Sequence, residues 1–142
     1  MNNDLKNAIE IIIANADKAD LLVQQADKIG KQLVSYPKRE DRLSTSQIRA
    51  LFGEVRQIEA QWNMGGQNAQ QAFRRLVLLK PKLAYRARKE RKPGVETLAE
   101  ILIYAVDQVI LEPDAVQRHS RFRHFVDFFE AILAYHKAHG GN

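Results

Sequence analysis

The sequence of 142 residues contains no cysteine. Disulfide bonds, thiolate metal sites and cysteine nucleophiles are therefore excluded. No apolar run approaches the roughly 18 residues that a membrane-spanning helix needs. The first residues are polar and acidic, unlike the basic and then apolar start of a signal peptide. We expect a cytoplasmic protein.

Proline and glycine are also scarce, with 4 and 7 residues, and they fall between periodic segments. No stretch combines alternating polarity with β-branched residues, so nothing in the sequence predicts a strand. The balance of 45% hydrophobic and 27% charged residues is that of a globular domain. We predict a single all-α domain over residues 1–142, a compact bundle of five or six helices.

A long helical arm, residues 1–34, is expected to precede the core bundle, residues 43–140. Apolar or small residues recur there at steps of three and four, as in a coiled-coil seam. The seam consists of Ile9, Ile12, Ala16, Ala19, Val23, Ala26, Gly30 and Leu33. Because alanine and glycine bury little area, we expect this arm to need a partner in the same chain or in a second copy. An ordinary bundle helix is the alternative interpretation.

Five further helices are expected in the core bundle. Ser44 and Gln47 have the spacing of a capping box, which predicts a helix start at this point. Pro81 should either kink its helix or open a separate basic helix of about ten residues. A mostly apolar helix over 95–111 should lie centrally, and Asp114 should cap the last helix.

Positive charge is concentrated on one short segment. From Lys80 to Lys92 there are seven Lys or Arg and one acid, Glu90, a net charge of +6 in a protein whose formal charge is +5. Such a concentration favours binding of a polyanion. Tyr85 lies among the cations, and this arrangement can hold phosphates and stack on a base. A membrane surface would need a larger apolar face, so nucleic acid is the expected partner.

Two other groups of basic residues could belong to the same surface. Arg49 and Arg56 lie seven residues apart, along one edge of their predicted helix. Arg118, Arg121 and Arg123 form a second group on the last helix. No helix-turn-helix, zinc finger or RNP motif is present, so binding should depend on backbone charge and stacking rather than on sequence.

Catalytic motifs are missing from the sequence. It has no HExxH, no phosphate-binding glycine loop and no GxSxG, so we expect no enzyme and no cofactor. His136 falls within a phenylalanine-rich stripe and should face the core. His136 and His139 could chelate a metal weakly, but no third ligand is apparent, and we expect no metal site. A metal-dependent nuclease that uses His119, His124, His136 or His139 is a competing hypothesis.

Three ordered stretches resemble a known family: LSTSQIR (43–49), LKPKLAY (79–85) and FFEAILAYHKAHGG (128–141). Their order and spacing are similar to those of the small subunit of the type III-A CRISPR effector, the Csm complex. The resemblance implies an all-helical, non-catalytic subunit that lines the channel where guide RNA pairs with target RNA. Several copies would work with other Csm subunits in antiviral defence. The chain departs from the family pattern after residue 85, where it carries extra cations.

Matching motifs single out Arg49, Lys80 and Lys82 for RNA phosphate contacts, whereas we expect Tyr85 and His136 to be structural. The full set of expected RNA-binding residues is Arg49, Arg56, Lys80, Lys82, Arg86, Arg88, Lys89, Arg91, Lys92, Arg121 and Lys137. An alternative function is a helical oligomerisation scaffold whose basic face binds an acidic protein. The small-residue seam also predicts self-association, with a homodimer as its simplest form.

Overall fold

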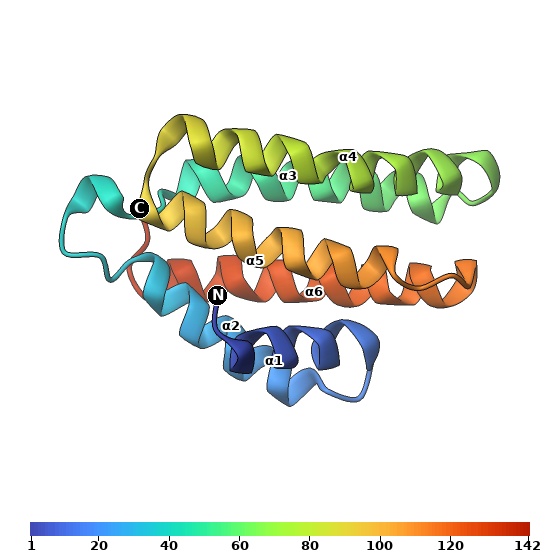
Figure 1. Ribbon diagram of the computed structural model, residues 1–142, viewed down its shortest axis with the longest axis horizontal. Helices are drawn as coiled ribbons and strands as arrows, with labels where there is room; N and C mark the ends of the chain where they lie inside the picture. The colour runs from blue at the N-terminus through green and yellow to red at the C-terminus, as the bar shows by residue number, and fades with distance from the viewer.

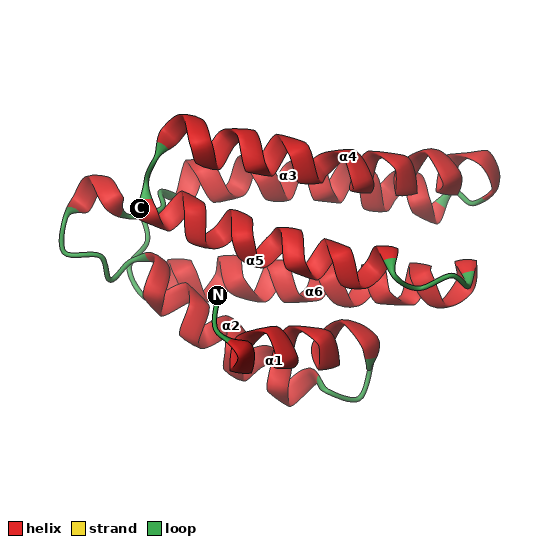
Figure 2. Cartoon of the chain, in the orientation of Figure 1, coloured by secondary structure: helices red, strands yellow, loops and turns green.

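Six α-helices and one short 3-10 helix make up the computed structural model, which describes residues 1–142 and has no strand (Figures 1 and 2). The predicted all-α class and helix number are confirmed. The α-helices are α1 (Asn3–Ala14), α2 (Ala19–Leu33), α3 (Thr45–Asn63), α4 (Gly66–Glu90), α5 (Pro93–Ile110) and α6 (Ala115–Ala138). The 3-10 helix is η1 (Arg39–Asp41).

The helices stack in layers (Figure 1). α3 and α4 pack side by side, α4 contacts α5, α3 contacts α6, and the α1–α2 hairpin covers the opposite side of α5 and α6. α5 and α6 therefore lie centrally, as the apolar composition of α5 predicts. The core is rich in aromatic rings from α6, and Trp62 of α3 stacks on Phe122 with ring centroids 4.5 Å apart. None of the helices combines the length and hydropathy needed to cross a bilayer.

The start of α3 has the predicted capping box. The Gln47 backbone N–H donates to Ser44 Oγ at 3.3 Å, and the Ser44 N–H donates to Gln47 Oε1 at 3.0 Å. Asp114 caps α6 with its side chain alone, accepting from the Gln117 N–H at 2.9 Å. Each cap gives partners to N–H groups that lack them at a helix start, so local sequence alone fixes these two boundaries.

The prediction of a separate basic helix after Pro81 is wrong. α4 continues through Pro81 as one helix of 25 residues, and Pro93 opens α5. A proline inside a helix removes one backbone hydrogen bond and costs about 3 kcal/mol. Leu76, Leu79 and Leu83 keep the helical spacing across the proline and are all buried, so their packing offsets this cost.

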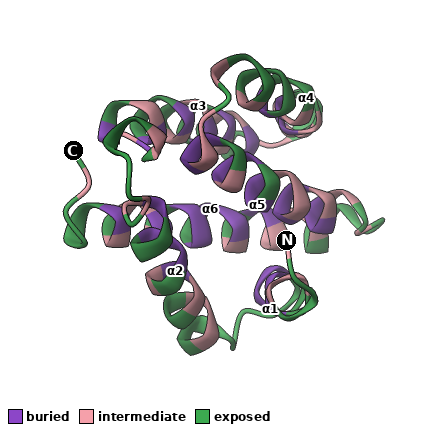
Figure 3. Cartoon of the chain, turned by 60° about the vertical axis from the view of Figure 1, so that its left-hand side comes forward, coloured by how far each residue is buried: buried purple, intermediate pink, exposed green.

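The long N-terminal arm is not one continuous helix. The chain turns between α1 and α2, and Asn15 ends α1 by donating from its side-chain amide to the Ile11 carbonyl at 2.9 Å. The buried faces of both helices point toward the bundle (Figure 3). The ends of the predicted seam therefore pack against other helices of the same chain. The central residues of the seam, Ala16, Ala19 and Val23, are exposed.

Gly30 allows α2 to cross α6 at close range. A Cβ atom at this position would lie 2.7 Å from the His136 backbone nitrogen and 2.7 Å from Tyr135 Cβ. Neither atom belongs to the mobile end of a side chain. The hydrogen atom of Gly30 is thus what lets the two helix backbones approach.

Candidate nucleic-acid interface

The seven cations between Lys80 and Lys92 fall into two sets. Lys80 pairs with Asp107 of α5, and Lys82 pairs with Glu54 of α3 at 3.0 Å. The other five make no ion pair, and all are exposed except the half-buried Lys92: they are Arg86, Arg88, Lys89, Arg91 and Lys92. The last turns of α4 and the two residues that follow it thus present unpaired positive charge, whereas the middle of α4 does not.

Arg56 is also held by carboxylates. Its guanidinium pairs with Glu59 at 2.7 Å and with Glu130 of α6, and it lies 4.8 Å from the centroid of the Phe52 ring. The hydrogen bond to Glu59, together with both carboxylate charges, raises the pKa of Arg56 despite partial burial. Because its donors point at acids of its own chain, Arg56 is poorly placed for phosphate.

Arg121 has a structural role as well. It donates to the Gln108 carbonyl of α5 at 2.9 Å, and its Nε lies 3.7 Å from a Glu112 carboxylate oxygen. It ties α6 to the end of α5. Arg121 therefore does not join the cations of α4.

Unpaired cations gather instead around the first turns of α3. Ser46 and Ala50 line both a groove that holds Arg86 and Lys89 of α4 and a neighbouring hollow that holds Arg49 and Lys137. Gln47 lines that groove and a third hollow that holds Lys92. Around this helix start lie Arg49, Arg86, Lys89, Lys92 and Lys137, which we call the basic rim.

The N-terminus of α3 adds to the positive potential of the basic rim. Helix N-termini carry a partial positive charge and favour anions. The first turn of α3 contains no acidic residue. The Thr45 N–H already donates to a main-chain oxygen of Asn142, and the Gln47 N–H donates to Ser44 Oγ. The helix therefore adds only a partial positive charge, and the side chains of the rim provide the main attraction for anions.

Sequence reasoning missed Arg39 and Arg42, which line the third hollow. The mixed charges of this stretch indicated only a linker. Arg42 Nε donates to the Tyr36 carbonyl at 2.7 Å, so it mainly holds the linker, whereas Arg39 makes no ion pair. Arg88 and Arg91 line none of these three hollows.

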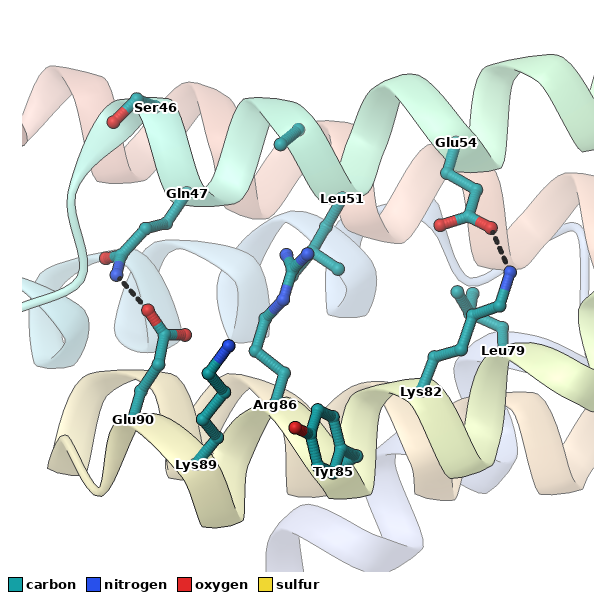
Figure 4. A pocket seen from close by; sticks show the side chains of 11 residues that line it. Ser46, Gln47, Leu51, Glu54, Leu79, Lys82, Tyr85, Arg86, Lys89 and Glu90 are labelled. Atoms are coloured by element: carbon teal, nitrogen blue, oxygen red, sulfur yellow. Dashed lines mark hydrogen bonds and ion pairs between the residues drawn. The ribbon is translucent and has the colours of Figure 1, made fainter.

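The groove between α3 and α4 has a volume of about 630 Å³ and is crossed at both ends by polar pairs (Figure 4). Gln47 donates to Glu90 at 2.9 Å at one end, and Lys82 pairs with Glu54 at the other. Tyr85 is 67% exposed, and its hydroxyl makes no hydrogen bond. The expectation that Tyr85 has a structural role is therefore wrong.

The four histidines each hold neighbouring elements together. His136 is fully buried and donates from Nε2 to the Leu43 carbonyl at 2.7 Å, which confirms that it faces the core. His124 Nδ1 contacts the Ile13 carbonyl at 2.7 Å, and His139 Nε2 lies 2.6 Å from Asp27. The structure contains no group of three or more His, Cys, Asp or Glu side chains that could hold a metal ion.

His119 gives a pH prediction. Burial against α3 and the nearby charge of Arg123 lower its pKa from 6.5, and Glu59 opposes this effect only in part. Because folding disfavours the protonated ring, the free energy of unfolding should be constant above about pH 6.5, fall as the pH drops from 6.5 to the lowered pKa, and be constant again below it. Urea unfolding at several pH values measures this. His119→Gln should remove this loss, and an unchanged pH profile in the variant would contradict the prediction.

A model of the Csm2 Type III-A family matches residues 16–142. The chain belongs to the Csm2 family. It is therefore a small structural subunit of the type III-A Csm complex and interacts with other Csm subunits. The match includes α2 and the core bundle, but not α1. No curated protein and no solved structure matches the chain. The family predicted from the three sequence motifs is confirmed.

Proposed function

We propose that this Csm2 protein is a non-catalytic RNA-binding subunit in the cytoplasm. Several copies would line the channel where guide RNA pairs with target RNA during antiviral defence. The basic rim would contact phosphates without reading sequence. The observation that carries this proposal is the gathering of five cations without ion pairs around the start of α3.

Ion pairs within the chain support a smaller set of phosphate contacts than the sequence alone suggests. Lys80, Lys82, Arg56 and Arg121 are engaged by acids of the same chain, so their charges are already compensated. The rim residues keep their donors free, and a guanidinium can bind a phosphate through two parallel hydrogen bonds. We therefore assign the main RNA contacts to the rim, and weaker contacts to Arg88 and Arg91.

The absence of catalysis is part of the proposal. All four histidines contact other parts of the chain, and their positions follow from packing. Incubation of RNA with the protein and Mg²⁺ or Mn²⁺ tests this point. Intact RNA is expected, whereas cleavage that is lost on histidine substitution would support the nuclease hypothesis.

A salt titration tests RNA binding. If about four phosphates are contacted, the slope of log affinity against log salt on single-stranded RNA should be near −3, because each contact on a single strand contributes about −0.7. RNAs of unrelated sequence should give similar affinities. A flat salt response would contradict the proposal. Poly-glutamate that binds the protein more tightly than RNA would favour an acidic protein partner instead.

Self-association of isolated chains stays a separate prediction. The seam that motivated it packs largely within the chain, through Ile9, Ile12 and Leu33. Sedimentation of the protein over a range of concentrations measures its mass. A concentration-dependent increase would show a dimer, and a constant monomer mass would contradict the prediction.

A further inference from the structure

The groove between α3 and α4 has features that phosphate binding alone does not require. Its floor includes Leu51 and Leu79, and the largely exposed ring of Tyr85 lies on its α4 side (Figure 4). A flat apolar group that covers this ring and the apolar floor would gain free energy, because it removes apolar surface from water. The volume of about 630 Å³ lies within the range of small-molecule sites.

The length of the groove limits what can enter it. The two polar pairs that cross it involve Gln47 and Glu54 of α3, seven residues apart. At 1.5 Å per residue this spacing is about 10 Å along the helix. An extended peptide would place only about three residues in this length. One planar base fits between the pairs without breaking either.

The charges beside the groove indicate that a ligand with a planar base in the groove would also carry an anionic group. Arg86 and Lys89 line the groove and make no ion pair, whereas the acid Glu54 is paired with Lys82. Glu90 accepts from the Gln47 amide through one oxygen, keeps its negative charge and leaves its other oxygen without a partner, so two free cations and one unpaired carboxylate line the groove. A nucleotide has the matching chemistry, because its base can stack on Tyr85 while its phosphates contact Arg86 and Lys89.

We infer that this groove is a base-binding pocket for a single unpaired nucleotide of the bound RNA. The inference rests on the proposed RNA-binding function and adds a stacking contact to it. A base inside a duplex has both faces covered, so only an unpaired nucleotide can enter. Such a pocket accepts any base, because every base has a π-face.

The test compares two RNA duplexes that differ in one base. One carries a single unpaired uridine, and the other an abasic nucleotide at the same position, so their phosphates are identical. The full-length protein should bind the uridine duplex about 10-fold more tightly, since stacking on an aromatic side chain contributes about 1–3 kcal/mol. Tyr85→Ala should abolish this preference, and Tyr85→Phe should retain it. The affinity for the abasic duplex and its salt slope should be unchanged in both variants.

A crosslink locates the base directly. With 5-iodouridine as the unpaired nucleotide, irradiation should join the RNA to residue 85 in the wild type and in Tyr85→Phe, but not in Tyr85→Ala. Equal affinity for both duplexes and no crosslink at residue 85 would overturn the inference and leave the proposed function intact if the salt slope persists. Loss of all salt-dependent binding would overturn both. Saturation by micromolar free AMP would overturn the assignment to RNA and identify a free nucleotide as the occupant.

Discussion

Replacing Arg49, Arg86 and Lys137 together by glutamine should raise the Kd for single-stranded RNA about 100-fold at 0.1 M salt. These three residues come from α3, α4 and α6, and none makes an ion pair. Three lost phosphate contacts should make the slope of log affinity against log salt less steep by about 2. Extrapolated from 1 M to 0.1 M salt, a slope change of about 2 corresponds to an approximately 100-fold change in Kd. Fluorescence anisotropy with labelled RNA over a salt series measures both quantities.

A second triple variant provides the matched control. This variant replaces Arg56, Lys80 and Arg121 by glutamine. It therefore loses the same number of arginines and lysines, and the same total charge, as the first variant. Each of these residues pairs with an acid. We expect its Kd to rise less than 10-fold. If both triple variants weaken binding equally, net charge and not the basic rim controls the affinity, and the assignment of the rim is wrong.

Gly30→Ala should lower the free energy of unfolding by about 2 kcal/mol. The new methyl group would lie 2.7 Å from the His136 nitrogen, closer than real Cβ contacts allow, so α2 and α6 must separate. Overpacking of this kind costs about 1–3 kcal/mol. The separation would also strain the buried hydrogen bond between His136 and the Leu43 carbonyl. Urea unfolding followed by circular dichroism gives the change.

Gly53→Ala is the control for Gly30→Ala. Both glycines lie inside helices, but a Cβ at Gly53 would meet nothing within 4 Å. The variant should be more stable by about 0.5–1 kcal/mol, because alanine is a better helix former. The free energy of unfolding should therefore fall for Gly30→Ala and rise for Gly53→Ala. A gain in stability for Gly30→Ala would show that α2 does not cross α6 at this distance.

Local sequence predicted several features of the fold because short-range interactions produce them. The capping box at Ser44 and the cap at Asp114 each join residues three apart. The burial of His136 followed from its place in a stripe of phenylalanines at helical spacing. The wrong predictions, a helix break at Pro81 and a continuous arm, both concern positions where packing between distant helices decides whether a helix continues.

The sequence by itself determined the all-α class, the concentration of charge after residue 80 and the three motifs of the Csm2 family. Only the tertiary structure decided which cations are free. Lys80 and Lys82 find their acids on other helices, 27 and 28 residues away along the chain. Arg56 pairs with Glu59 of its own helix and also with Glu130 of α6, 74 residues away. Helical periodicity fixes the face of the helix on which a side chain lies. An ion pair also needs the charged nitrogen and oxygen atoms of two side chains to lie within about 4 Å of each other. That approach is set by how the helices pack, and it selects the basic rim from the wider set of basic residues.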